Sequence, residues 1–250
     1  MDRSDVLELA SAVARELESA GASAVVLAGS YSRGDAHELS DIDLYAIGAG
    51  ARYTLRAMDG RLVAISWRTE DDERSALRDP AMVGAAVPAW RAARVLVDRA
   101  GVGDALQREA ERFDWSTIEA ACDAWVAEQV VGYTEEVLKL VAARRAGDRL
   151  GAAVQRAVLA LRLPGVMAVH RRLLYETENR LWRLVAEAVG PEWAAAQDAA
   201  LRAESAGSAD TSALALFTLA VDEAAPLFSP AQSEVIDLAR RSIEDDRLRS

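Results

Sequence analysis

The residue pattern changes character near residue 112, and this change constrains the fold more than any other feature of the sequence. Before it, short apolar runs typical of buried strands alternate with amphipathic helical patterns. After Phe113, the apolar residues follow the helical period and no segment has a strand pattern. The chain is therefore predicted to be of the α+β class. A small α/β domain is expected over residues 1–112, followed by an all-α helical bundle over residues 113–250.

Local signals place the elements of the first half. An amphipathic helix is expected before Gly21, and Asp59-Gly60 between two apolar runs predicts a hairpin. Another helix is expected over Glu70–Leu77, whereas Pro88 is taken to mark a loop. The predicted strands are Ala24–Leu27, Asp43–Ile47, Tyr53–Ala57, Leu62–Trp67 and Arg94–Val97.

The second half carries longer helical patterns. Ser116–Ala146 has a continuous apolar stripe and predicts one long helix, while Ala206–Thr211 has the composition of a loop. The next helix is expected to be interrupted or kinked at Pro164-Gly165. The remaining predicted helices are Leu150–Tyr175, Glu178–Val189, Pro191–Glu204, Ser212–Leu227 and Pro230–Arg241.

Composition excludes several classes of protein. Hydrophobic residues make up 51% of the 250 residues, which is too many for a disordered chain. No apolar run approaches the roughly 20 residues of a membrane span, and the N-terminal segment lacks a signal-peptide core. The net charge of −11 argues against a nucleic-acid-binding surface. A soluble cytoplasmic protein with neither nucleic-acid nor membrane partners is expected.

The residues that could bind metal are few. Cys122 is the only cysteine, which excludes an intrachain disulfide and a cysteine-ligated zinc site. His37 and His170 are too few for most histidine-rich metal centres.

One segment carries a pattern suited to phosphate. The predicted strand Ala24–Leu27 runs into Gly29-Ser30, and a new turn begins before Gly34. Glycine lets the backbone approach a ligand closely, and a serine hydroxyl with free backbone N–H groups can hold phosphate oxygens. Arg33 adds a positive charge or braces the loop. Taken alone, a Gly-Ser loop is more often a plain turn.

Two carboxylates follow at the start of the next strand. Asp41 and Asp43 are two residues apart, so an extended chain places both on one face, with Ile42 on the other. Adjacent like charges repel each other, and a Mg²⁺ ion that also binds phosphate oxygens relieves this repulsion. Alone, such a pair is more often a solvated loop edge.

Together, Gly29-Ser30, Gly34 and Ser40-Asp41-Ile42-Asp43 resemble the pattern of the DNA polymerase β-like nucleotidyltransferase superfamily. The resemblance covers roughly residues 1–98. It implies a mixed sheet, a Mg²⁺ ion held by Asp41 and Asp43, and ATP or another nucleoside triphosphate as co-substrate. It also implies nucleotide binding by Gly29, Ser30, Arg33 and Ser40.

The helical half carries a closer resemblance. Tyr133–Lys139 and His170–Thr177 resemble segments of kanamycin (aminoglycoside 4'-O-) nucleotidyltransferase. This resemblance implies that Glu135 is the general base for the acceptor hydroxyl and that Lys139 lies near the nucleotide phosphates. Lys139 is the only lysine among 29 basic residues, although an ordinary Glu135–Lys139 pair on a solvated helix face explains the spacing too. The family also implies a homodimer.

One departure from the superfamily pattern concerns a third carboxylate. The superfamily usually has an acid on the strand after the hairpin, where this chain has Ala64 or Val63. Three explanations are open. The enzyme works with two metal carboxylates and Glu135, or one of the acids Glu70–Asp72 folds back into the site, or the domain binds nucleotide without transferring it.

The sequence thus favours a Mg²⁺-dependent adenylyltransferase. It is expected to move a nucleoside monophosphate from ATP, or another nucleoside triphosphate, to a hydroxyl of an aminoglycoside-type antibiotic and so confer resistance. Two alternatives are open. The acceptor is a lincosamide, another metabolite or a protein side chain, or the domain is a degenerate nucleotide binder.

Overall fold

A computed structural model describes residues 3–203 and 205–248 of the chain. The described residues form two compact units, one within 1–117 and one within 118–250. The first unit contains the sheet, and the second unit is helical. Each unit is described by itself below.

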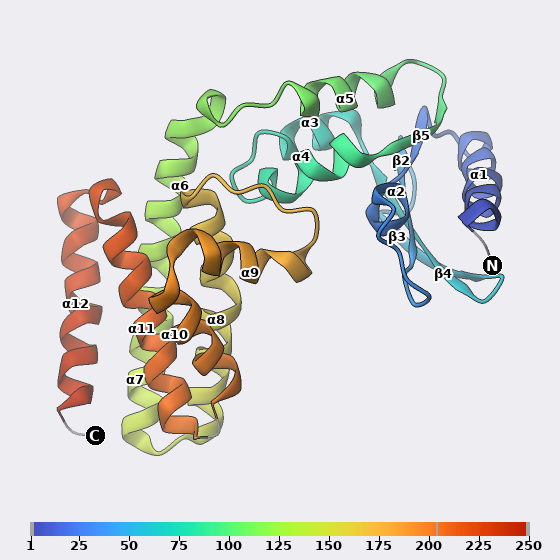
Figure 1. Ribbon diagram of the computed structural model, residues 1–250. Coiled ribbons are helices and arrows are strands. Elements are labelled where there is room, and N and C mark those ends of the chain that lie inside the picture. The colour runs from blue at the N-terminus through green and yellow to red at the C-terminus, as the bar shows by residue number, and fades with distance from the viewer. Residues whose placement is uncertain (1–2, 204, 249–250) are drawn as a thin grey trace. The chain divides into compact units, whose positions relative to one another are not determined.

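The first unit is built on a mixed sheet of five strands in the order β3-β4-β2-β1-β5 (Figure 1). Strands β1 and β2, β1 and β5, and β3 and β4 pair antiparallel, whereas β2 and β4 run parallel. Asp59 and Gly60 both have positive φ in the tight turn between β3 and β4, which confirms the predicted hairpin. The strands are β1 (Ala24–Leu27), β2 (Ile42–Ile47), β3 (Tyr53–Met58), β4 (Arg61–Arg68) and β5 (Arg94–Asp98).

Helix α1 (Arg3–Ser19) packs on one face of this sheet. Its apolar residues form a buried core with Leu27, Leu44 and Ile65 from the sheet. Because strand side chains alternate between faces, Asp43 and Ala64 belong to the opposite face. The hydrophobic alternation along β2 therefore decides which face carries the carboxylate.

The other helices of this unit are α2 (Gly29–Arg33), α3 (Glu70–Ala76), α4 (Val83–Ala92) and α5 (Val102–Glu111). Helix α5 contacts β1 and β5, and α4 contacts α2, α3 and α5. The prediction that Pro88 marks a loop is wrong, because Pro88 lies inside α4. Its missing N–H costs a helical hydrogen bond, and burial of Val87 and Trp90 on the same helix offsets that cost.

The second unit contains only helices among its described residues (Figure 1). A 3₁₀ turn, Trp115–Ile118, leads into it, and a second one, Ala225–Leu227, lies between its last two α-helices. The α-helices are α6 (Glu119–Gly132), α7 (Thr134–Ala146), α8 (Arg149–His170), α9 (Glu178–Val189), α10 (Pro191–Arg202), α11 (Ala206–Ala224) and α12 (Pro230–Arg247).

Three predictions about these helices are corrected. The single helix predicted over Ser116–Ala146 is interrupted at Tyr133, directly after Gly132, a residue of low helix propensity. The helix predicted to reach Tyr175 ends at His170. The loop predicted at Ala206–Thr211 is the first part of α11. The predicted end of a helix at Glu204 lies outside the described residues.

The N-terminal cap and the packing of α11 explain why a helix forms where a loop was expected. The Ser205 hydroxyl accepts a hydrogen bond from the Ser208 N–H at 3.1 Å. Asp210 is buried and pairs with Arg156 of α8 at 2.8 Å. Tertiary contacts therefore override the loop-like composition.

Helix α8 is long and apolar enough to cross a membrane, by length and composition only. Half of its most apolar window is buried inside the fold, as in the core helix of a helical bundle. No other helix in 3–203 or 205–248 passes this test.

Candidate functional site

The close approach of Gly29 to Asp43 is the central feature of the site. Helix α2 begins at Gly29, whose φ is +64°. The preceding Ala28 N–H donates to the Asp43 carbonyl at 2.9 Å, which ties this loop to β2. A Cβ at position 29 would lie only 2.0 Å from Asp43 Oδ2. Only glycine satisfies both the backbone conformation and this contact.

The surroundings of Asp43 make ionisation of its carboxyl group unfavourable. Burial and the neighbouring Asp41 carboxylate raise the pKa of Asp43 to about 6, while Arg33 opposes the shift. The unit therefore brings Gly29, Arg33, Asp41 and Asp43 together. An added cation would relieve the repulsion between the two carboxylates.

The other predicted nucleotide-binding residues of this unit have local roles in the loop. The Ser30 carbonyl accepts hydrogen bonds from the N–H groups of Gly34 and Asp35 and closes the single turn of α2. Arg33 pairs with Asp35, with 3.2 Å between Nε and Oδ1. The Ser40 hydroxyl accepts from the His37 N–H at 2.9 Å, so it stabilises the turn that leads into Asp41.

The strand register places Ala64 at the position of the absent third carboxylate. Asp43 of β2 pairs directly with Ala64 of the parallel strand β4. Side chains of directly paired residues share a face, so a buried methyl group lies where an acid would face Asp43. The expectation that the departure falls at Ala64 or Val63 resolves to Ala64.

The acids Glu70–Asp72 do not fold back into this site. Strand β4 continues past Ala64 to Arg68, a distance of about 13 Å at 3.3 Å per residue. Thr69 then caps α3 in a capping box with Asp72, and Glu70 pairs with Arg74. The second explanation offered above for the missing acid is therefore wrong.

A charged network on the sheet face of Asp43 was not predicted from the sequence. Glu73 is 1% exposed and accepts hydrogen bonds from Arg68 at 2.8 Å and from Trp90 at 2.6 Å. The Arg68 guanidinium lies 4.4 Å from the centre of the Tyr45 ring. This network fixes α3 and α4 on the sheet beside β2. Glu73 follows three other acids in the sequence, so no local signal singles it out.

The residues present fit a Mg²⁺ ion that shares its coordination with a substrate. No group of three or more His, Cys, Asp or Glu side chains suited to a metal occurs in the part of the chain that the structure describes. Mg²⁺ commonly uses one or two protein carboxylates and takes its other ligands from water and phosphates. Asp41 and Asp43 provide such a pair.

In the helical unit, Glu135 and Lys139 pair with each other on α7. The distance from Lys139 Nζ to Glu135 Oε1 is 2.7 Å, and the Glu135 side chain is 71% exposed. This hydrogen bond and the charge of Lys139 hold the pKa of Glu135 below its ordinary value. Glu135 is therefore a weaker base than an unpaired glutamate, because its nearest partner is a cation.

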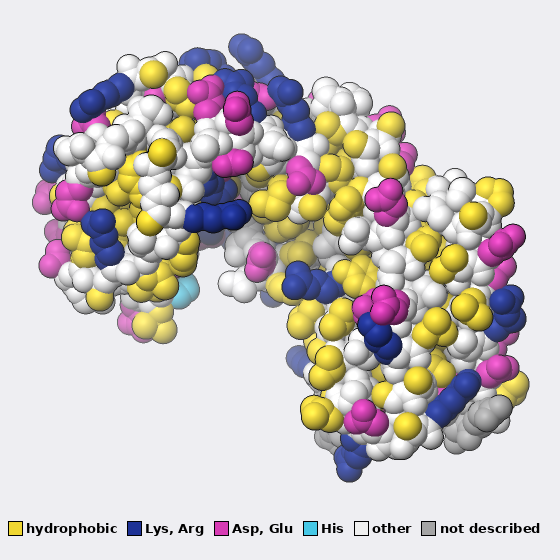
Figure 2. Space-filling model, turned by 180° about the vertical axis from the view of Figure 1, so that it is seen from behind, with side chains coloured by type: hydrophobic (Ala, Val, Ile, Leu, Met, Phe, Trp, Pro, Cys, Tyr) yellow, Lys and Arg dark blue, Asp and Glu magenta, His cyan; other side chains and the backbone are white. Residues whose placement is uncertain are grey.

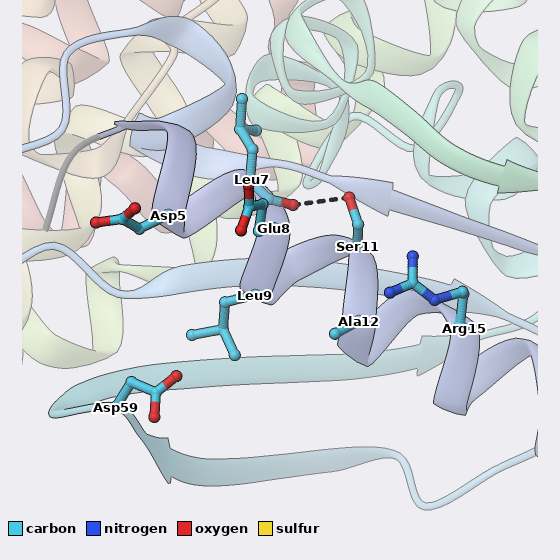
Figure 3. Close-up of a pocket in the computed structure, with 8 residues that line it drawn as sticks. All are labelled: Asp5, Leu7, Glu8, Leu9, Ser11, Ala12, Arg15 and Asp59. Carbon is cyan, nitrogen blue, oxygen red and sulfur yellow. Dashed lines mark hydrogen bonds between the residues drawn. The ribbon is translucent and has the colours of Figure 1, made fainter.

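The first unit also has a surface depression. It has a volume of about 760 Å³ and is lined by the outer side of α1 and by Asp59 of the hairpin turn (Figure 3). Its lining includes the apolar Leu7 and Leu9 and the charged Glu8 and Arg15. Helix α1 covers the sheet face opposite to Asp43, so the depression contains none of the predicted site residues.

Comparisons with known proteins agree with this geometry. Residues 8–78 match the sequence model of the nucleotidyltransferase domain, a segment that includes both Gly29 and Asp43. The solved structure of a nucleotidyltransferase-like protein from Exiguobacterium sibiricum 255-15 is similar, with a TM-score of 0.56 and 12% identity. The alignment covers 88% of this chain and 78% of that chain. No curated protein matches the sequence.

The chain therefore carries a nucleotidyltransferase domain followed by a helical region. The overall class is α+β, with a mixed five-stranded sheet, as the residue pattern predicted. At 12% identity the similar solved structure supports the fold alone.

Proposed function

We propose that this protein is a Mg²⁺-dependent nucleotidyltransferase that adenylates a hydroxyl group of a small molecule. The observation that carries the proposal is the contact between Gly29 and the Asp43 carboxylate, whose charge is destabilised by burial and by Asp41. A site that keeps two adjacent carboxylates at such a cost is suited to a cation.

The chain's own residues have distinct roles in this proposal. Asp41 and Asp43 would hold Mg²⁺, which when bound neutralises charge on the phosphate oxygens. Gly29 lets the backbone approach the triphosphate, and the Ser30 hydroxyl donates to a phosphate oxygen. Arg33 contributes positive charge beside them. Ser40 fixes the turn that presents Asp41.

The proposed reaction is an in-line displacement. The acceptor oxygen attacks the α-phosphorus of ATP or another nucleoside triphosphate and forms a new P–O bond. The bond from the α-phosphorus to the bridging oxygen breaks, and pyrophosphate leaves with that electron pair. Glu135 takes the hydroxyl proton, and Lys139 lies near the phosphates. These two roles rest on the resemblance of Tyr133–Lys139 to the kanamycin nucleotidyltransferase family.

An aminoglycoside is the proposed acceptor, because the helical region resembles that family and a chain of net charge −11 attracts polycations. Acidic and basic side chains are interspersed on the face shown in Figure 2, so the negative charge is not gathered into one field there. Leu55 and Leu62 are exposed on the sheet face of Asp43 and suit an apolar ring. A lincosamide, another metabolite or a protein side chain therefore belongs among the acceptors to test.

The family resemblance further supports a homodimer, and the charge and composition favour a cytoplasmic protein with neither nucleic-acid nor membrane partners. A second candidate function is nucleotide binding without transfer. The methyl group of Ala64 beside Asp43 favours it, because one carboxylate of the superfamily pattern is absent.

Transfer of label from α-³²P-ATP in the presence of Mg²⁺ tests the proposal. The acceptor panel contains aminoglycosides, lincosamides and a no-acceptor control, and a parallel series contains EDTA. Mg²⁺-dependent label on an aminoglycoside is the expected result. Mg²⁺-dependent binding of a non-hydrolysable ATP analogue, without label on any acceptor, favours the second candidate. If the protein neither binds the analogue nor transfers label, both candidate functions are contradicted.

A further inference from the structure

Helix α2 cannot hold its own position. It has five residues, and its N-cap residue Ala28 makes no side-chain capping bond. A single helical turn is unstable in water without tertiary support. The backbone at Gly29 and Ser30 must therefore be held against Asp43 by contacts outside the turn.

Tyr31 is the buried residue of α2. The residue is 9% exposed and belongs to the core cluster that includes the buried face of α1. The ring points into the α1 side of the sheet, whereas Asp43 faces the other side. Tyr31 therefore anchors the turn from behind without contacting the carboxylates.

Arg61 holds this anchor from another part of the chain. It is the first residue of β4, and its Nη1 donates a hydrogen bond to the Tyr31 hydroxyl. Its guanidinium carbon lies 5.7 Å from the centre of the Tyr31 ring, in range for a cation–π interaction. Arg61 Nε is buried and has no hydrogen-bond partner among the described residues. The guanidinium is therefore partly desolvated in order to contact Tyr31.

We propose that Tyr31 and Arg61 form a clamp that positions the phosphate-binding turn for the nucleotide. The inference rests on the proposed function. Tyr31 is two residues from Gly29, and Arg61 begins the strand that pairs with β2, which carries Asp43. The clamp thus links both sides of the Gly29–Asp43 contact. Both are positioning residues, because neither faces Asp43.

The test uses three single variants of the full chain, the double variant Tyr31→Phe with Arg61→Gln, and a matched control. Tyr31→Phe keeps the ring in the core and removes the hydroxyl. Arg61→Gln removes the cation, and Arg61→Lys retains a charged donor. Arg56→Gln is the control, because Arg56 lies in the same hairpin and pairs with exposed Glu16 at 3.0 Å instead of contacting α2.

The first measurement is the Kd of a non-hydrolysable ATP analogue with Mg²⁺, by calorimetry. Tyr31→Phe and Arg61→Gln should each weaken binding by about fivefold. This is less than the full contribution of a hydrogen bond to a charged group, because only the part that positions the turn affects nucleotide binding. Arg61→Lys should recover part of the loss. The double variant should bind no more weakly than Arg61→Gln, because both single changes remove the same hydrogen bond.

Two further measurements separate positioning from general stability. Amide hydrogen exchange should rise at residues 29–34 in Tyr31→Phe and in Arg61→Gln, and not in Arg56→Gln. In the transfer assay, KM for the nucleotide should rise while KM for the acceptor stays unchanged. If the wild-type protein binds the analogue, and Tyr31→Phe and Arg61→Gln match it in affinity and in hydrogen exchange, the proposed clamp role is wrong. If the wild-type protein does not bind the analogue, the nucleotide function fails instead.

Discussion

Asp43 and Glu135 are both proposed to act in transfer, yet their surroundings are opposite. Asp43 is largely buried beside another carboxylate, and the pKa of Asp43 is raised to about 6. Glu135 is mostly exposed beside a lysine, and the pKa of Glu135 is lowered. The first environment destabilises the charge, and the second stabilises it.

This difference shows how far each residue's surroundings alone indicate function. A pair like Glu135–Lys139 is common on solvated helices, where it stabilises the helix only slightly. It needs no ligand to explain it. The Asp41–Asp43 pair has a cost that a bound cation offsets, so its surroundings themselves point to a ligand. The assignment of Asp43 is argued from the structure, whereas that of Glu135 depends on resemblance.

The largest expected effect is on transfer when the Asp43 charge is removed. Asp43→Asn should lower kcat/KM by about 1000-fold, because a metal ligand and its electrostatic stabilisation are lost together. Asp59→Asn is the control, since Asp59 is an exposed residue of the hairpin turn and Asn also suits its positive φ. The α-³²P transfer assay measures both. Equal activity in the two variants would remove Asp43 from the site.

Gly29→Ala should have the next largest effect. A Cβ 2.0 Å from Asp43 Oδ2 forces the turn and the carboxylate apart, and a displacement of about 1 Å can cost about 100-fold in rate. Gly60→Ala separates this clash from backbone strain. Gly60 has a similar φ of +74°, and its added Cβ would meet nothing within 4 Å. Both variants should lose stability by about 1 kcal/mol from strain, and only Gly29→Ala should lose activity. Full activity of Gly29→Ala would contradict the proposed contact.

Glu135→Gln gives the sharpest test of the weaker assignment. A general base contributes about 100-fold or more to kcat, and the lowered pKa of Glu135 makes it a weak base, so a loss near the lower limit is expected. Glu136→Gln is the matched control, because Glu136 also lies near Lys139, at 3.9 Å. Steady-state transfer kinetics with a saturating acceptor measure kcat. If the two variants behave alike, Glu135 is an ordinary surface partner of Lys139.

Local pattern was sufficient to predict on which face of the sheet Asp43 lies. The period-two alternation of β2 places Asp43 opposite the apolar core, which is a short-range rule of strands. The choice of Ala64 over Val63 as its neighbour needed the register between β2 and β4, which the sequence left open. The turn at Gly29 also follows from its sequence neighbours.

Long-range contacts were the part that could not be predicted. Arg61 and Tyr31 are 30 residues apart and meet only because β4 and α2 are brought together by the sheet. Helix α4 forms despite Pro88, and α11 begins in an apparent loop, because buried side chains compensate for poor local propensity. Glu73 is distinguished from its acidic neighbours only by burial against Trp90 and Arg68.

The smallest expected effect concerns stability and tests whether the Asp43 charge is truly costly. The folded-state pKa of about 6 exceeds the ordinary value of 3.8, so the folded state binds the proton more tightly. Stability contributed by this group therefore falls as pH rises between these values, and the full cost is present above pH 6. Asp43→Asn removes that cost and should stabilise the protein at pH 8 by about 1–2 kcal/mol.

Urea denaturation of the wild type and Asp43→Asn at pH 5 and pH 8 measures this difference, and Asp59→Asn again provides the control. The gain should be smaller at pH 5, where Asp43 is mostly protonated. Added Mg²⁺ should narrow the gap at pH 8, because the ion binds and stabilises the wild-type carboxylate pair and not the variant. A gain that is equal at both pH values, or no gain, would mean that the charge of Asp43 is as well accommodated as that of Glu135. The contrast between the two regions, and the structural argument for a cation at Asp43, would then fail together.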